Sequence, residues 1–218
     1  ARLTSALDRD QRTELVLLQL DCLAGLGRWQ ECIEIGMLEL DQLLLRNEPK
    51  QLSRLHGIIG FAHMRLGSIR KAESHLRAAI HILTWDLGEV EEALREQRRL
   101  SLMFKNLGYW RHAQFELEKA IEIADEHRVE RESGSLRVNL AILLLKAGVI
   151  HQVPHLLDEA EPSLASAGPS KWLTNSRLVR ANYLRITGHP AKALEILTPA
   201  LRTFFLWKCS RLAMIWRL

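Results

Sequence analysis

The apolar residues of this chain recur with the spacing of amphipathic helices, and similar turns interrupt them at regular intervals. Each turn contains a glycine, and successive glycines are 40, 41, 40 and 40 residues apart: Gly27, Gly67, Gly108, Gly148 and Gly188. Glycine suits the left-handed backbone conformation that often ends a helix. The pattern therefore predicts five pairs of antiparallel helices, each pair joined by one of these turns.

A second regularity follows each turn glycine. Five positions later the chain carries a small or medium-sized residue: Cys32, Ala72, Ala113, Val153 and Ala193. Four repeats then carry a leucine followed three residues later by an alanine: Leu76 and Ala79, Leu117 and Ala120, Leu157 and Ala160, Leu197 and Ala200. The first repeat departs from this rule, with Gly36 and Glu39 at the same positions. Such side chains allow two helix axes to approach closely, and no alternating strand pattern competes with them.

The segments LGSIRKAESHLRAAIHIL (Leu66 to Leu83) and LGYWRHAQFELEKAIEIA (Leu107 to Ala124) resemble tetratricopeptide repeat (TPR) proteins. The period of about 40 residues is similar to the long repeats of kinesin light chains and of bacterial regulator sensor domains. The resemblance implies an all-α, right-handed superhelical solenoid of about five TPR-like hairpins, forming a single domain over residues 1–218. The expected repeats are 11–47, 51–86, 91–127, 131–167 and 171–204, and 205–218 is expected to be a terminal helix or part of a next repeat.

Composition favours a soluble, cytoplasmic binding protein without a cofactor. The net charge is only +4, the three cysteines form no CxxC pair, and no apolar run is long enough to span a membrane. Motifs for phosphate binding, dinucleotide binding, nucleophilic catalysis and zinc proteolysis are absent, so we expect no enzyme activity. His151, His155 and Glu159 have metal-ligand spacing, but Pro154 and the turn at His151 count against a metal site.

In TPR solenoids the first helix of each hairpin lines the concave surface, so the resemblance directs attention to the residues before each turn glycine. Eight of them are the candidate groove residues, expected to bind a ligand: Arg54, Arg95, Arg98, Arg99, Lys105, Asn139, Asn182 and Arg185. Phe61, Arg65, Ser135, Ile142 and Asn175 are expected to face outward on the same helices. An amide can bridge the backbone of an extended peptide, and clustered arginines suit a carboxylate or a phosphate.

These features predict a scaffold or sensor domain that holds an extended segment of an acidic protein or peptide partner. We expect it to be the regulatory part of a larger signalling or transcription-regulator protein, because the chain lacks an initial methionine and stops within a repeat. Three alternatives stay open. In the first, the arginines pair with Glu91, Glu92 or Glu96 on a solvated face. In the second, the basic face binds RNA, and in the third, the apolar end from Leu201 to Leu218 forms a homodimer or lies on a membrane surface.

Overall fold

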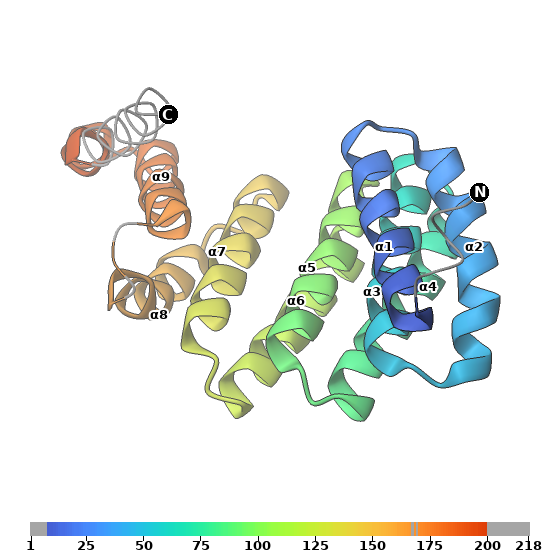
Figure 1. The fold of residues 1–218 in the computed structure, drawn as a ribbon. Helices are drawn as coiled ribbons and strands as arrows, with labels where there is room; N and C mark the ends of the chain where they lie inside the picture. The colour runs from blue at the N-terminus through green and yellow to red at the C-terminus, as the bar shows by residue number, and fades with distance from the viewer. Residues whose placement is uncertain (1–7, 167, 169, 200–218) are drawn as a thin grey trace, which may run out of the picture. The chain divides into compact units, whose positions relative to one another are not determined.

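The computed structural model describes residues 8–166, 168 and 170–199, and they form helices joined by short connections (Figure 1). No strand occurs among these residues, so the expected all-α fold is confirmed. Contacts divide the chain into two compact units, unit 1 (Ala1–Leu107) and unit 2 (Gly108–Leu218), each described by itself. The segment 205–218, expected to be a terminal helix or an interface, lies outside the described residues.

Unit 1 begins with two helical hairpins. Helix α1 (Arg9–Gly25) packs against α2 (Trp29–Arg46), and α3 (Pro49–Arg65) packs against α4 (Ile69–His81), which continues as the π-helical segment η1 (Ile82–Asp86). Helix α3 also contacts α1, α2 and α5 (Val90–Asn106), so it lies at the centre of the unit. The sequence explains two of the helix starts. Asp8 and Gln11 form a capping box on α1, and Pro49 occupies the first turn of α3, where its missing N–H is not needed.

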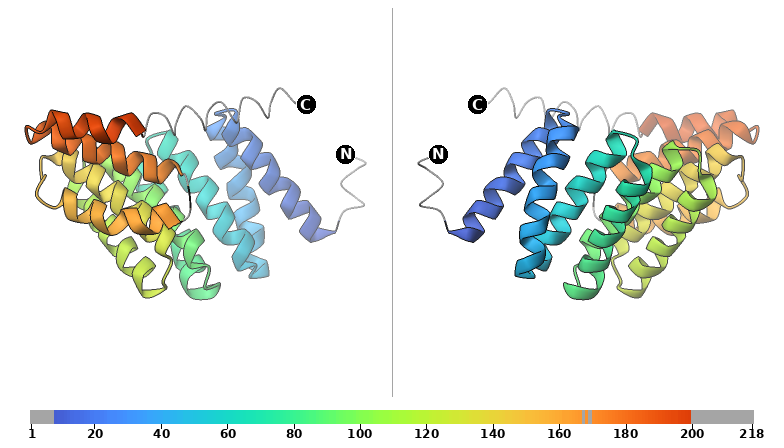
Figure 2. Two further views of the ribbon diagram at one scale, coloured as in Figure 1. Left: turned by 90° about the vertical axis from the view of Figure 1, so that its left-hand side faces the viewer. Right: turned by 90° about the vertical axis from the view of Figure 1, so that its right-hand side faces the viewer.

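Unit 2 continues the pattern with α6 (Trp110–Glu126), α7 (Glu130–Ala147), α8 (Val153–Ser166) and α9 (Lys171–Ile186). A further helical stretch covers 190–199. Helix α7 packs against α6, α8 and α9, and α8 packs against α9 (Figure 2). Ser170 caps α9, because its Oγ accepts a hydrogen bond of 3.2 Å from the backbone N–H of Leu173.

The turn glycines adopt the conformation that their spacing predicted. Their φ angles are +74° at Gly27, +75° at Gly67, +79° at Gly108, +80° at Gly148 and +83° at Gly188. A side chain on Cβ is strained in this left-handed region, whereas glycine adopts it freely. Each turn therefore reverses the chain at little energetic cost.

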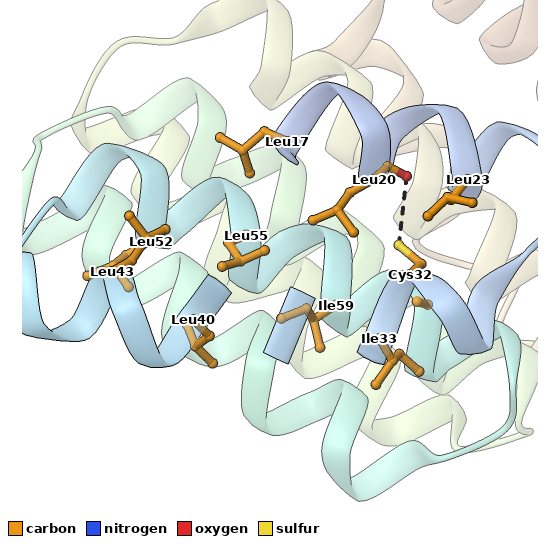
Figure 3. Close-up of a cluster of buried hydrophobic side chains, with 11 residues drawn as sticks. Leu17, Leu20, Leu23, Cys32, Ile33, Leu40, Leu43, Leu52, Leu55 and Ile59 are labelled. Atoms are coloured by element: carbon orange, nitrogen blue, oxygen red, sulfur yellow. Dashed lines mark hydrogen bonds between the residues drawn. The ribbon is translucent and has the colours of Figure 1, made fainter. Parts of the chain in front are cut away.

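The small residues that follow the turns are buried. Cys32, Ala72, Ala113 and Val153 have no exposed surface, and Ala193 is also buried. Figure 3 shows the crossing in unit 1, where Cys32 of α2 points towards Leu20 of α1. The Cys32 thiol donates a hydrogen bond of 3.7 Å to the backbone oxygen of Leu20. Leucines and isoleucines of α1, α2 and α3 surround this contact and form the core.

The first repeat departs from the rule for a packing reason. At Gly36 an added Cβ would lie 2.8 Å from Cγ1 of the fully buried Ile59, so the α2–α3 contact leaves no room for leucine. Glu39 replaces the usual alanine and is buried, but its carboxylate accepts a hydrogen bond of 3.1 Å from the Thr13 hydroxyl. A polar pair between α1 and α2 thus replaces an apolar contact.

A similar close approach in unit 2 yields a test of the packing. An added Cβ at Gly134 of α7 would lie 3.1 Å from the backbone oxygen of Ala160 in α8. We expect Gly134→Ala to lower the free energy of unfolding by about 1–3 kcal/mol, because the backbone must shift. Gly25→Ala is the control, since no atom lies within 4 Å of its added Cβ, and it should be neutral or stabilising by about 0.5 kcal/mol. Urea denaturation measures both, and equal effects would contradict the packing described.

Candidate functional site

Arg54, the first of the candidate groove residues, joins two helices of unit 1. Its guanidinium, on α3, lies 2.6 Å from Oδ2 of Asp21 and 3.2 Å from Oε2 of Glu14, both on α1. All three side chains are partly exposed, so water weakens their attraction. The charge of Arg54 is therefore already matched by two carboxylates, and its predicted place in a binding groove stays a prediction.

The arginines of α5 are paired along their own helix. Nη1 of Arg95 lies 3.0 Å from Oε1 of Glu92, and Nη1 of Arg99 lies 2.7 Å from Oε1 of Glu96. Arg99 also lies over the ring of Phe61 in α3, with its Cζ 5.7 Å from the ring centroid. Arg98 and Lys105 interact with other residues too. The pairing with glutamates that the sequence left open is thus present, and ligand binding by these arginines stays a prediction.

Unit 1 contains a cleft of about 670 Å³ between the first turns of α3 and α5. Lys50 and Arg54 line it on α3, and four glutamates line it around the start of α5: Glu89, Glu91, Glu92 and Glu96. Burial raises the pKa of the Glu96 carboxyl, and the neighbouring Arg99 opposes that rise. Whereas the sequence suggested a basic groove, the lining of this cleft is mixed in charge.

Asn139, on α7 of unit 2, is the candidate residue with the most unusual surroundings. Its side chain is half-buried, and its Nδ2 group is fully buried without a hydrogen-bond partner among the described residues. Leaving a buried donor unpaired costs about 1–3 kcal/mol, so native structures rarely do so. An unpaired amide of this kind is a reason to look for a ligand.

A second cleft, of about 370 Å³, lies between α7 and α9. Six residues line it: Ile142, Leu145, Lys146, Leu178, Val179 and Asn182. Most of this lining is apolar, and Asn182 and Lys146 add the polar groups. The Asn182 Oδ1 accepts hydrogen bonds of 3.2 and 2.9 Å from Nε and Nη2 of Arg185. Within the described residues, the Nδ2 group of Asn182 has no partner.

We name the α7–α9 surface as the six lining residues of this cleft together with Asn139, which stands one helical turn before Ile142 on α7. Asn139 and Asn182 therefore lie on two helices that pack together, and their role in ligand binding stays a prediction. Ile142 belongs to the surface as well. The expectation for Ser135 was wrong: its side chain is fully buried and donates a hydrogen bond of 3.0 Å to the backbone oxygen of Glu132.

The sequence reasoning missed two partly buried arginines that connect helices in unit 2. Arg137 of α7 lies 2.8 Å from Asp125 of α6 and 2.9 Å from Glu159 of α8. Arg180 of α9 lies 2.8 Å from Asp158 and 3.0 Å from Glu161, both on α8. No charge pattern within one helix reveals these pairs, because their partners stand 12 to 22 residues away.

The histidines of α8 do not converge on a metal position. Nδ1 of His155 lies 3.7 Å from Oε1 of Glu159. In the described part of the chain, no three His, Cys, Asp or Glu side chains are arranged to hold a metal ion. None of the helices described is both long and apolar enough to cross a membrane.

Comparison with known proteins identifies the fold. No model of a known protein family matches the chain, and no curated protein matches it by sequence. Solved structures do match. A putative kinesin light chain with TPR-like repeats from Podospora anserina has a TM-score of 0.69 at 16% identity, and the match covers 90% of this chain and 97% of that one.

Two Rap proteins match as well. The apo form of RapI has a TM-score of 0.80 at 11% identity, with 90% of this chain and 55% of that one covered. A Rap protein in complex with Competence and Sporulation Factor has a TM-score of 0.67 at 16% identity, covering 99% and 64%. The present chain therefore spans little more than half of RapI. Its fold is that of the TPR-type helical repeat proteins.

The two kinds of arginine provide a test of their roles. Arg137 is largely buried among three partners, so we expect Arg137→Ala to lower the free energy of unfolding by about 1–3 kcal/mol. Arg54→Ala should cost at most about 1 kcal/mol, because its ion pairs are exposed to water. Chemical denaturation of the two variants beside the parent chain measures the difference, and a larger loss for Arg54→Ala would contradict it.

The Arg137 cluster also predicts how stability depends on acid. The Arg137 guanidinium holds the pKa of the Asp125 carboxyl below its ordinary value of 3.8. The stabilisation by the Arg137–Asp125 ion pair is therefore fully present above pH 3.8. It is lost as the pH falls through the pKa of Asp125 in the folded chain. Asp125→Asn should remove this part of the acid dependence, which denaturation curves at a series of pH values will measure. An unchanged pH profile would show that the ion pair contributes nothing.

Proposed function

We propose that this chain is a protein-interaction scaffold that binds an extended peptide segment of a partner protein along the α7–α9 surface of unit 2. The observation that carries the proposal is the buried, unpaired Nδ2 group of Asn139, one turn from a cleft that ends at Asn182. An extended peptide offers a backbone carbonyl at every residue. A carbonyl bound to Asn139 would remove the cost of its unpaired donor.

The cleft supplies the second part of the recognition. Its volume of about 370 Å³ suits one or two side chains, and the lining from Leu145, Leu178 and Val179 favours apolar ones. In an extended peptide, backbone carbonyls and side chains alternate along the chain. Its carbonyls can therefore bind the two amides while an apolar side chain enters the cleft. The cleft would select peptides by their side chains, whereas the two amides would bind the backbone of many sequences.

The charges at the rim of the cleft indicate which type of partner it favours. Lys146 lines the cleft, and Arg185 is exposed beside Asn182. Within the described residues neither forms an ion pair with a carboxylate, whereas Arg54, Arg95 and Arg99 of unit 1 do. Lys146 and Arg185 favour a peptide that carries a carboxylate near its apolar side chain. The acidic partner expected from the sequence is thereby proposed for unit 2, not for the arginines of α5.

The solved structures support binding in general terms. One Rap protein was solved in complex with Competence and Sporulation Factor, so this fold accepts a bound factor in at least that protein. We propose that the present chain has a comparable regulatory role within a larger signalling or transcription-regulator protein. Binding of RNA is less favoured, since the ion pairs of Arg54, Arg95 and Arg99 reduce their attraction for phosphate.

The test begins with selection of peptides from a phage-displayed library of random 12-residue sequences, using the whole chain as bait. Synthetic copies of the selected peptides are then titrated against Asn139→Ala, Asn182→Ala and the parent chain by fluorescence anisotropy. Each substitution should weaken binding about tenfold, since a hydrogen bond lost from a desolvated site costs about 1–1.5 kcal/mol.

The control is Gln152→Ala, which removes an exposed amide from the connection between α7 and α8. It should bind the peptides as the parent chain does, and circular dichroism should show that all variants remain helical. Peptides that bind all four proteins equally would place the binding surface elsewhere. Failure to select any peptide would argue against a peptide-binding function.

A further inference from the structure

Three histidines gather in unit 1 where α4 packs on α3, and we call them the histidine trio: His56, His63 and His75. Nδ1 of His56 lies 2.9 Å from Nδ1 of His75, and the two ring centroids are 5.1 Å apart. The ring of His63 stacks on that of His75 at a centroid distance of 5.7 Å. His75 therefore contacts both of the other imidazoles, and the contacts join α4 to α3.

The short contact between His56 and His75 requires that at most one of the facing nitrogens carry a hydrogen. In a neutral pair, one Nδ1–H donates and the other Nδ1 accepts. When both rings are protonated, two N–H groups and two positive charges face each other at this distance, and the hydrogen bond is lost. Nδ1 of His63 is also buried and has no partner, so no acceptor is in place for a proton there.

The surroundings offer little to balance a positive charge. Lys71 of α4 is close enough to act on His63 and His75, and its charge opposes their protonation. Within the described residues, no carboxylate forms an ion pair with the trio. Five acids on α4 and on the elements packed against α3 and α4 have other partners: Glu14 and Asp21 of α1 with Arg54, Glu39 of α2 with Thr13, Glu73 of α4 with Arg77, and one carboxylate oxygen of Glu96 on α5 with Arg99. The other acids on these elements and their connections are Asp10, Glu31, Glu34, Asp41, Glu48, Asp86, Glu89, Glu91 and Glu92.

We propose that the histidine trio is an acid-sensitive contact, which holds α4 on α3 at neutral pH and releases it in mild acid. The contact is lost once both rings of the His56–His75 pair are protonated, because two N–H groups and two positive charges then replace the hydrogen bond within a half-buried space. The released element is α4, the second helix of the hairpin whose first helix, α3, carries Arg54. The inference does not depend on the peptide site proposed for unit 2.

The direction of the pH effect follows from the histidine pKa values. Burial lowers the pKa of His56 and of His63, and burial together with His56 lowers the pKa of His75 to about 4. Unfolded histidine has an ordinary pKa of 6.5, so below that value the unfolded chain binds more protons than the folded chain. The stabilising contribution is thus complete above pH 6.5 and is lost as the pH falls towards 4. This range lies above the one in which Asp125 titrates.

The experiment compares thermal unfolding at about pH 7 and about pH 5 for the parent chain and for the triple variant His56→Asn/His63→Asn/His75→Asn. Asparagine keeps a hydrogen-bonding nitrogen near the position of Nδ1 but does not titrate. Between the two pH values, the melting temperature of the parent should fall by about 4–8 °C more than that of the triple variant. Hydrogen exchange followed by mass spectrometry should show faster exchange in residues 49–86 of the parent at the lower pH, after correction for the intrinsic rate.

His155→Asn is the matched control, since His155 is an exposed histidine on α8 of unit 2. It should show the same pH dependence as the parent chain. If the triple variant keeps that dependence as well, the proposal is wrong. A metal site would give a different result: a rise in melting temperature with added Zn²⁺ that the triple variant lacks would also overturn the proposal.

A second measurement covers the case in which the triple variant does not fold. Imidazole carbon and nitrogen shifts of the isotope-labelled parent chain, followed by NMR across the same pH range, report each histidine separately. The trio should stay neutral as the pH falls below the ordinary histidine pKa of 6.5. Three ordinary titration curves near 6.5 would falsify the acid-sensitive contact.

Discussion

The hairpins of this chain depend on the close crossing of two helices at a small, buried side chain. Cys32, Ala72 and Val153 mark three of these crossings, within the pairs α1–α2, α3–α4 and α7–α8, and have no exposed surface. Five residues earlier, a glycine with positive φ reverses the chain, so the turn fixes which residue reaches the crossing. The larger side chains around the crossing can then interdigitate at the density of a protein interior.

The fold was predictable because its determinants are local and repeated. The turn glycines, the small residues and the apolar spacing each recur at 40 to 41 residues, so five imperfect copies reinforce one interpretation. The first repeat shows the limit of this reasoning. Nothing local indicates that Glu39 is buried, because its partner Thr13 stands on the other helix of the hairpin. The same holds for Arg137, which joins α6 to α8 through residues far apart in sequence.

For the candidate site the sequence indicated which helices carry the residues, but not their chemistry. Asn139 and Asn182 lie on α7 and α9, which pack together, and Arg54 lies on α3, while their part in ligand binding stays a prediction. The repeat phase did not reveal that Arg54 is held by two acids of α1, whereas Asn139 has a buried amide without a partner. Such differences depend on which side chains meet across helices. The prediction that Ser135 faces outward was wrong for a related reason. A short polar side chain can form its hydrogen bond with the backbone of its own helix and so be buried.

The fixed phase between turn glycine and crossing residue limits how such a chain can change its length during evolution. A single residue inserted within a helix turns every later side chain on that helix by about 100° around the axis, which carries apolar residues into water and polar ones into the core. Duplication or loss of a whole repeat preserves the phase and the nearest-neighbour contacts. Chains of this type are therefore expected to differ from their relatives in the number of repeats more often than in the length of any one helix.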